Sequence, residues 1–215
     1  MKIIATNIGS PVTFSWKGRE VSTGLFKYPV PSPIFVEKED VINDNVIDRR
    51  YHGGFDKACY LYAADHYNYW QSLYPKMVMQ FGMFGENLTV EGLHEANINI
   101  GDIYKIGIAV VQVTQPRQPC FKLEFRFGSS PMIKQFVKSG FPGVYVRVLN
   151  PGKVNKGDEM ILTERKESLS VQKVFELLYA KEFHKEAVEM IVKEPLLAES
   201  CRRDLIKRWK IVSDN

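Results

Sequence analysis

One cysteine of this sequence lies between two cations in a proline-rich stretch. In Thr114–Gly128, TQPRQPCFKLEFRFG, Cys120 has Arg117 three residues before it and Lys122 two residues after it. The thiolate is the reactive and metal-ligating form of cysteine, and a neighbouring Arg or Lys favours it. We therefore interpret Cys120 as a candidate nucleophile or metal ligand. A buried structural cysteine is the alternative.

The other cysteines carry no such signal. Cys59 lies in the apolar run ACYLY and Cys201 falls on one face of a predicted helix, so both are expected to be buried. Pro116 and Pro119 are expected to keep the Cys120 segment from acting as a central strand and to fix it as an extended loop beside a cavity. Three widely spaced cysteines indicate a reduced, cytoplasmic thiol set rather than a disulfide framework.

A second stretch, DRRYHGGFDKACY, could hold an anion. Gly53 and Gly54 let the backbone approach a ligand closely and can expose consecutive amide N–H groups. Cationic or imidazole side chains surround this turn at Arg49, Arg50, His52 and Lys57. The combination predicts a site for an oxyanion, phosphate above all. The glycine spacing is not that of a Walker loop, and a solvated turn with two glycines is the alternative.

A third stretch, FGMFGENLTVEGL, places two polar residues in an aromatic setting. The amide of Asn87 offers a donor and an acceptor to the edge of a heterocycle, and the carboxylate of Glu86 accepts from ring N–H groups. The alternative is an ordinary loop in which Asn87 satisfies backbone groups.

Charge and patterning exclude several classes. A formal net charge of +4, from 29 Lys and Arg against 25 Asp and Glu, is too small to indicate nucleic-acid binding and is compatible with anionic small molecules. The sequence has neither a signal-peptide pattern at its start nor an apolar run long enough to predict a membrane helix. The four histidines lack the paired spacing of a metal site, and His66 and His184 are expected on or near helix surfaces.

The elements that must position these residues are predicted to be mostly strands as far as about Arg165. Runs rich in Val, Ile and Tyr alternate with turn residues, which is typical of a β-barrel or sandwich. Seven runs are predicted strands: KIIATNI, IFVEK, ACYLY, DIYKIG, AVVQVTQ, VYVRVL and EMILTE. Two helices interrupt them, AADHYNYWQSLYP and SSPMIKQFVKSG. In the second, Ser130 is a candidate cap, Pro131 suits the first helical position and Gly140 can end the helix.

The rest of the chain has helical periodicity. Three short helices are predicted, one capped by Ser168 or Ser170, one at KEAVEMIVK and one at LLAESCRRDLIKRW after Pro195. They cannot bury much core alone, so they are expected to dock on the barrel or on a second chain, which leaves a homodimer open. The predicted organisation is a barrel domain over residues 1–165 and a three-helix domain over 168–213.

The helical tail is expected to serve assembly or partner docking rather than chemistry. Its end is basic, through Arg202, Arg203, Lys207, Arg208 and Lys210. A solvated helix face is one interpretation of these charges. Docking to an acidic electron-donor protein is the other, since complementary charge speeds encounter.

Taken in order, these stretches resemble the MOSC-domain family (the molybdenum cofactor sulfurase C-terminal domain), and most of all its YiiM-like branch. DRRYHGGFDKA, FGENLTVEGL, NINIGDIYKIG, VTQPRQPCFKL and NPGKVNKGD carry the resemblance at family-like spacing. The tail is similar to the three-helix domain that follows MOSC in that branch. One departure is visible: the family often has a Gly-Asp pair upstream of the His-Gly-Gly loop, where this sequence has Asn43–Asp44.

The resemblance implies a mainly β fold, a MOSC β-barrel with a few inserted helices, followed by a small all-α domain. It implies that the chain binds the molybdenum cofactor, a molybdopterin with a dithiolene and a phosphate, and that Cys120 ligates molybdenum. Arg117 is expected to orient the cofactor or to stabilise negative charge near the metal. The expected cofactor contacts are Arg50, His52, Gly53, Gly54, Lys57, Glu86, Asn87, Arg117 and Lys122.

Members of this family reduce N-hydroxylated compounds, including hydroxylaminopurine-type base analogues, so the implied activity is a detoxifying N-hydroxylamine reductase. The chain has too few cysteines for its own four-cysteine iron–sulfur cluster and no Gly-x-Gly-x-x-Gly fingerprint. Electrons are therefore expected from a separate flavin or iron–sulfur reductase. Two alternatives remain open, a sulfur carrier with a persulfide on Cys120 and a non-enzymatic cofactor carrier.

Overall fold

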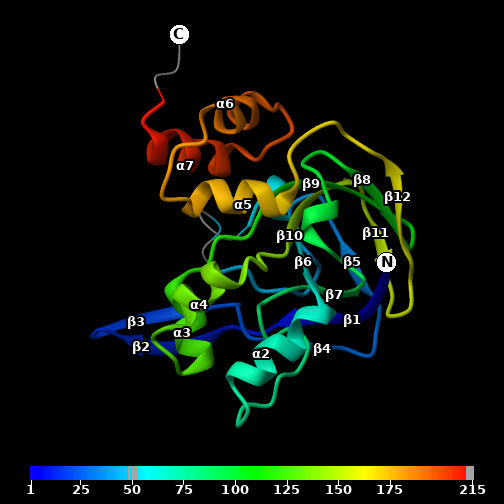
Figure 1. Cartoon of the computed structure of the whole chain (residues 1–215). Helices are drawn as coiled ribbons and strands as arrows, with labels where there is room; N and C mark the ends of the chain where they lie inside the picture. Colours follow the sequence, from blue (N-terminus) through cyan, green and yellow to red (C-terminus); the bar gives the residue numbers. More distant parts are fainter. Residues whose placement is uncertain (48, 50–52, 212–215) are drawn as a thin grey trace.

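The computed structural model describes residues 1–47, 49 and 53–211, and a single large sheet dominates it (Figure 1). The strand order in this sheet is β12-β8-β9-β10-β6-β7-β1-β4, with β6 and β7 parallel and the other neighbours antiparallel. Its strands are β1 Lys2–Gly9, β4 Lys27–Pro29, β6 Cys59–Ala63, β7 Leu88–Glu91, β8 Ile103–Ile106, β9 Ala109–Pro116, β10 Val144–Asn150 and β12 Met160–Glu164. Two small sheets pair β5 Ile34–Val36 with β11 Gly152–Val154, and β2 Val12–Trp16 with β3 Arg19–Thr23.

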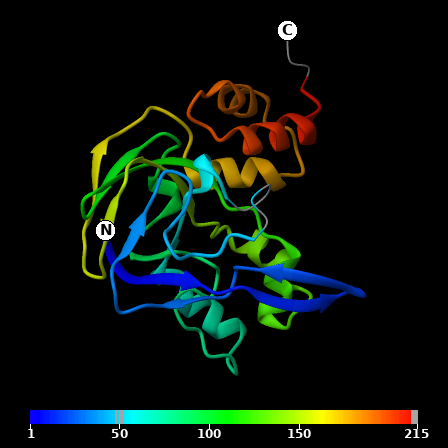
Figure 2. The same ribbon diagram turned by 180° about the vertical axis from the view of Figure 1, so that it is seen from behind.

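Backbone contacts join β12, at one end of the large sheet, to β1, the strand next to its other end. Lys2 in β1 forms a bridge with Glu159 beside β12, and the Met160 amide donates to the Met1 carbonyl at 2.9 Å. Figures 1 and 2 both place the start of β1 beside β12. The predicted mainly β architecture is therefore confirmed, with the pairing order of an open sheet in which β12 and β1 touch, rather than of a barrel closed by a continuous ladder.

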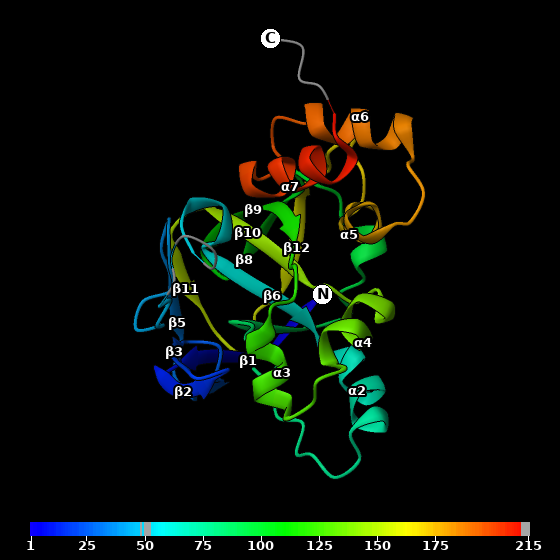
Figure 3. The same ribbon diagram turned by 90° about the vertical axis from the view of Figure 1, so that its left-hand side faces the viewer.

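Six α-helices of the described chain form two groups, which Figure 3 shows. One group packs around an aromatic cluster and contains α2 Tyr67–Leu73, α3 Phe121–Phe127 and α4 Met132–Ser139. The other contains α5 Val171–Tyr179, α6 Lys185–Lys193 and α7 Glu199–Trp209. Three short 3₁₀ turns are η1 Phe55–Lys57, η2 Ala64–His66 and η3 Glu95–Asn97. No helix in the described ranges is both long enough and apolar enough to cross a membrane.

The C-terminal helices dock on the sheet, as predicted. One cluster of buried apolar side chains runs from the strands into α5, α6 and α7, and it includes Val171, Leu177, Val188 and Leu205. The amide of Ala198 also donates to the carbonyl of Thr114 in β9 at 3.1 Å. Because this core is continuous, the helices are part of the same packed body as the strands. A second chain as a docking partner stays a prediction.

All seven predicted strands are present, but the hairpin of β2 and β3 was not expected. Its turn residues Lys17 and Gly18 have φ of 50° and 75°. A two-residue hairpin loop of this kind needs positive φ at both central positions, which glycine favours. The Lys-Gly pair between two β-rich runs was therefore a usable signal. Strands β4, β7 and β11 were also missed, each being only three or four residues long.

The Cys120 segment differs from the predicted extended loop. β9 is a central strand and includes Pro116, which pairs with Val144 of β10 in its last position. A proline at the end of a strand removes one donor where the pairing stops anyway. Only residues 117–120 are irregular, and α3 begins directly after Cys120 and ends at Gly128, with φ of 56°.

Two cap predictions have opposite outcomes. The Ser170 side chain caps α5 by accepting from the Lys173 amide at 3.2 Å, as predicted. Ser130 does not cap α4, because Pro131 directly precedes this helix and its side chain offers no hydrogen bond. The predicted end of α4 at Gly140 is confirmed.

His66 differs from the expectation of a helix surface. It is buried, hydrogen-bonded to Glu95 at 2.9 Å and stacked on Phe141 with 3.8 Å between ring centroids. His184 is exposed, as expected, at the start of α6. His66 is therefore a core residue, because its ring nitrogen pairs with a carboxylate and its face packs on an aromatic ring. Its position in the sequence did not predict this burial.

Candidate functional site

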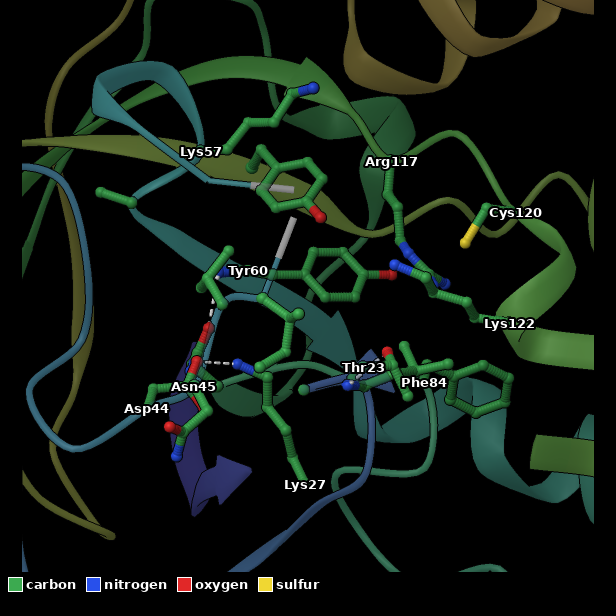
Figure 4. A pocket seen from close by; sticks show the side chains of 18 residues that line it. Thr23, Lys27, Asp44, Asn45, Lys57, Tyr60, Phe84, Arg117, Cys120 and Lys122 are labelled. Atoms are coloured by element: carbon green, nitrogen blue, oxygen red, sulfur yellow. Dashed lines mark hydrogen bonds and ion pairs between the residues drawn. The ribbon is translucent and has the colours of Figure 1, made fainter. Parts of the chain in front are cut away.

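A pocket with about 600 Å³ of space, its mouth included, opens where β9 runs into α3. Among the described residues, four cationic side chains line it: Lys27, Lys57, Arg117 and Lys122. Cys120 and Asn87 also line it, so the structure brings together five of the residues predicted from sequence. Figure 4 shows Arg117 and Lys122 converging beside Cys120, with the Tyr60 ring pointing toward them. The pocket is suited to an anionic ligand.

Arg117 is the most deeply placed of these cations, with 4% of its surface exposed. Its guanidinium lies over the rings of Tyr60 and Phe136, 5.3 and 5.5 Å from the two centroids. Burial lowers the pKa of Arg117, but Tyr60, Tyr145 and Cys120 raise it, and the net shift is upward, so the group stays charged. Within the described residues its buried Nη1 has no hydrogen-bond partner. An unsatisfied buried donor is costly, which makes this nitrogen a natural donor to a bound anion.

Cys120 is the accessible thiol of the chain. It is half-buried at the start of α3, and Figure 4 shows its sulfur facing the side chains of Arg117 and Lys122. Cys59 and Cys201 are fully buried, as predicted, and burial raises the pKa of each to about 12. At neutral pH those two thiols are therefore protonated and shielded, which leaves Cys120 for chemistry.

Lys57 brings the predicted anion loop to the pocket. It ends η1, and burial lowers its pKa while Cys201, Asp204 and Asp56 partly oppose that shift. Gly54 takes φ of 87°, which only glycine adopts readily, but neither Gly53 nor Gly54 is among the pocket-lining residues of the described chain. Arg50 and His52 lie outside the described residues. The phosphate cradle predicted for this loop therefore stays a prediction, with Lys57 as its placed member.

Arg49, another cation near this loop, does not line the pocket. It is exposed and forms ion pairs with Asp40 and with Glu39, the latter at 3.3 Å. These contacts raise its pKa, through Asp40 first. Arg49 lines a neighbouring groove rather than the pocket itself.

Glu86 lies behind the pocket wall instead of on it, which differs from the predicted pterin contact. The side chain is fully buried and accepts hydrogen bonds from the amides of Gly82 and Phe84 at 2.8 and 3.1 Å. Its carboxylate also accepts from the hydroxyls of Thr89, at 2.9 Å, and Tyr67. Because both oxygens are engaged, Glu86 organises the turn that precedes β7. The aromatic and glycine-rich setting gave no sign of this internal role.

Asn87 does line the pocket, and its amide is used within the protein. Its Nδ2 donates to Asp44 at 2.9 Å and its Oδ1 accepts from the Tyr60 amide at 3.3 Å. Asp44 also accepts from the Gly9 amide at 2.8 Å and forms a buried ion pair with Lys27. The floor of the pocket is thus a fixed polar network that joins β1, β4, β6 and the turn before β7.

The departure from the family's Gly-Asp pair has a simple structural account. Asn43 has φ of 65°, in the left-handed region that glycine adopts freely and that Asn tolerates better than other side chains. The turn shape that glycine would supply is therefore kept, and Asp44 is delivered to the buried pair with Lys27. Nothing in the local sequence pointed to Lys27, or to Tyr60 and Tyr145, as pocket residues.

A wider groove of about 2100 Å³, open solvent included, meets the pocket at Cys120. Its described walls are β3, Ile47, Arg49, the 115–122 segment and Asp204 of α7. Lys57, Lys122 and Tyr145 line both the pocket and the groove. The presence of Asp204 differs from the expectation that the helical tail stands apart from the chemistry.

Comparisons with known proteins show the family and the fold of the chain. The chain belongs to the MOSC domain family, which it matches over residues 48–161. It is 38% identical to YflK of Bacillus subtilis over 207 residues, which cover 96% of this chain and 93% of YflK. The crystal structure of YiiM from Geobacillus stearothermophilus has a TM-score of 0.80 and 34% identity, and the likeness covers 96% of this chain and 98% of that one.

A fungal relative has a different overall organisation. A protein of Gibberella moniliformis named "Reductase" is 36% identical over 151 residues. The match covers 69% of this chain but only 27% of that protein. A region like this chain is therefore one part of a longer polypeptide there, whereas YflK and YiiM match it along nearly their whole lengths.

Proposed function

We propose that this chain binds a molybdenum cofactor in the cationic pocket and reduces N-hydroxylated compounds, including hydroxylaminopurine-type base analogues. The observation that carries the proposal is the placement of the Cys120 thiol beside the buried Arg117 guanidinium, whose Nη1 has no partner in the described structure. Membership of the MOSC family supports the cofactor, and the name of the fungal relative supports redox chemistry.

The donor set of the pocket fits such a cofactor. A phosphate or other anionic group matches Lys57, Arg117 and Lys122, because charge-assisted hydrogen bonds are the strongest available to it. A thiolate at Cys120 matches a thiophilic metal. Within the described residues, no group of three or more His, Cys, Asp or Glu side chains is placed to hold a metal ion. The dithiolene of the cofactor would supply further sulfur ligands to a metal at Cys120.

The reaction replaces an N–O bond with an N–H bond. R–NHOH takes up two electrons and two protons, and gives R–NH₂ and water. The bound cofactor supplies the redox chemistry, while the protein holds and orients it. Here Arg117 and Lys122 would balance negative charge beside Cys120, and the buried Asp44–Lys27 pair would keep the pocket floor rigid.

The electrons would come from a separate flavin or iron–sulfur reductase. The fungal relative, in which a region like this chain occupies a minor part of a protein named for reduction, is consistent with donor modules outside the MOSC region.

Turnover tests the proposal. Protein from a cofactor-competent host would be supplied with 6-hydroxylaminopurine and a small chemical reductant, and 6-aminopurine would be followed by chromatography. We expect product from the wild type and none from Cys120→Ser, while Cys201→Ala, which removes a buried thiol, keeps activity if it folds. No product from molybdenum-loaded wild type would contradict the reductase. Persulfide sulfur on Cys120 by mass spectrometry, in protein without molybdenum, would favour the sulfur carrier.

A further inference from the structure

The groove that meets the pocket at Cys120 has a wall built by the C-terminal helix α7. Ser200 and Asp204 lie four residues apart on α7 and so share one face. The Ser200 hydroxyl donates to Gln115 Oε1 at 3.0 Å, and Gln118 Nε2 donates to Asp204 Oδ2 at 2.7 Å. Gln115 and Gln118 flank Arg117 in the chain. Helix α7 therefore holds a side chain on each side of Arg117, the most buried of the four cations that line the pocket.

The groove is lined by cationic side chains and by the carboxylate of Asp204. Of the cationic side chains that line it, Arg49 forms ion pairs with Asp40 and Glu39, and Lys57 and Lys122 also line the pocket. Within the described residues Asp204 is exposed and has Gln118 as its only hydrogen-bond partner, through Oδ2. Its Oδ1 is thus available to accept a hydrogen bond from a ligand.

The apolar part of the lining favours a flat molecule. Phe121, the first residue of α3, and Tyr145, on β10, both line the groove close to Cys120. Aromatic side chains offer ring faces and edges to a planar heterocycle. A planar ligand with N–H donors along one edge could pack its ring system against these side chains and donate a hydrogen bond from that edge to Asp204.

We propose that this groove binds the organic substrate and that Asp204 is its specificity-determining residue, accepting a hydrogen bond from an N–H group of a planar N-hydroxylated amidine or aminopurine, other than the nitrogen that carries the hydroxyl. The proposal rests on the proposed reductase function and deepens it. Gln118 holds the carboxylate in place, and Cys120, at the junction of groove and pocket, marks the end at which the N–OH group would be reduced. Asp204 takes no part in the redox step.

The first test measures binding without turnover. Two non-reducible probes are compared by calorimetry, adenine, which has a ring N–H group, and 9-methyladenine, which has none. We expect wild type to bind adenine more tightly than 9-methyladenine. In Asp204→Asn, the amide oxygen can still accept from Gln118, but an N–H₂ group then faces the ligand. Adenine affinity should fall about tenfold or more, as expected for a lost hydrogen bond to a charged group, while 9-methyladenine affinity should change little.

The matched control is Glu199→Gln, which makes the same charge change on α7 at an exposed residue that pairs with Arg202 and does not line the groove. It should leave adenine affinity unchanged. An equal loss of affinity in this control would overturn the proposal, because the effect would then come from the overall charge of the helix.

The second test is kinetic and separates the groove from the reductase itself. With 6-hydroxylaminopurine, Asp204→Asn should raise KM about tenfold and leave kcat within about twofold, because an interaction made equally in ground and transition states affects KM alone. If wild type reduces the substrate but Asp204→Asn changes neither KM nor adenine affinity, the groove assignment is wrong and the reductase stands. If adenine binding depends on Asp204 but wild type with cofactor reduces nothing, the reductase is wrong and the groove stands as a site for planar N–H donors.

Discussion

The guanidinium of Arg117 lies over the Tyr60 ring, 5.3 Å from its centroid, with one nitrogen that no described residue hydrogen-bonds. Stacking positions a cation without using its N–H groups. Burial raises the pKa of Tyr60 well above its usual value, so the phenol stays protonated and donates to the Pro142 carbonyl at 2.8 Å. The protein thereby fixes a buried positive charge and leaves part of its hydrogen-bonding capacity for a ligand.

Arg117→Met should reduce cofactor binding without lowering the melting temperature. The variant removes a buried charge with an unsatisfied donor, and replacing such a group by an apolar side chain of similar length is often neutral or stabilising. We expect an unchanged or higher melting temperature for the cofactor-free protein, and loss of cofactor from protein made in a competent host. A large fall in melting temperature together with full cofactor content would contradict the role assigned to Arg117.

Asp44→Asn should destabilise the fold. The Asp44 and Lys27 side chains are 2% and 8% exposed, and removal of one partner leaves an uncompensated buried charge, at about 3–5 kcal/mol. Urea unfolding measures the loss. The double variant Asp44→Asn with Lys27→Met serves as the control and should recover part of the stability. If the double variant is no more stable than the single one, the hydrogen bonds of Asp44 to Gly9 and Asn87 matter more than its charge.

Asn43→Gly and Asn43→Ala should differ in stability. Glycine adopts φ of 65° without a Cβ clash, whereas alanine pays about 1 kcal/mol or more there. We expect the glycine variant to match or exceed wild-type stability in urea unfolding and the alanine variant to fall below it. Equal stability of the two variants would mean that backbone conformation at this position is not what selects Asn.

Thiol labelling should distinguish Cys120 from the other cysteines. Because burial raises the pKa of Cys59 and Cys201 to about 12, both stay protonated well above neutral pH. Iodoacetamide at pH 8 should modify one thiol per native chain, Cys120, and three after unfolding, as read by mass spectrometry. From pH 9 upward the thiols ionise in the unfolded chain but not in the folded one. The free energy of unfolding should therefore decrease as the pH rises from 9 toward 12. Rapid native labelling of Cys201 would contradict the packing of α7.

Glu86→Gln tests whether this carboxylate is structural. A glutamine keeps one acceptor oxygen but turns the other into a donor that faces the amide of either Gly82 or Phe84. We expect a loss of about 1–3 kcal/mol in unfolding free energy. Cofactor affinity of the folded fraction should be unchanged. Weaker cofactor binding at unchanged stability would restore the direct pterin contact predicted from sequence.

Local patterns predicted the elements of the fold better than the partners of individual side chains. The seven predicted strands and the helices with clear apolar stripes followed from local sequence patterns, because burial of one face imposes a periodicity. Helix α3 was missed since two prolines dominate the residues before it, although its helical apolar pattern and Gly128 were available as signals. The short strands β4 and β11 depend on tertiary pairing that no local pattern records.

Only the part of the candidate site that is local in sequence could be predicted. Cys120, Arg117 and Lys122 are neighbours in sequence, so a short stretch sufficed to associate them. Lys27 and Tyr145 reach the pocket from distant strands, and Asp204 reaches the groove from the last helix. Glu86 was expected to contact a ligand, but it accepts four hydrogen bonds from within the protein. The sequence alone does not distinguish these two roles of a buried carboxylate.

Metal content tests the central claim most directly. Wild type, Cys120→Ser and Cys201→Ala would be purified from the same molybdenum-cofactor-competent host, and molybdenum and pterin would be measured per folded chain. We predict both in wild type and in Cys201→Ala, and a Cys120→Ser protein that folds but has lost its molybdenum. Wild-type molybdenum in folded Cys120→Ser would contradict the assignment of Cys120 as the metal ligand.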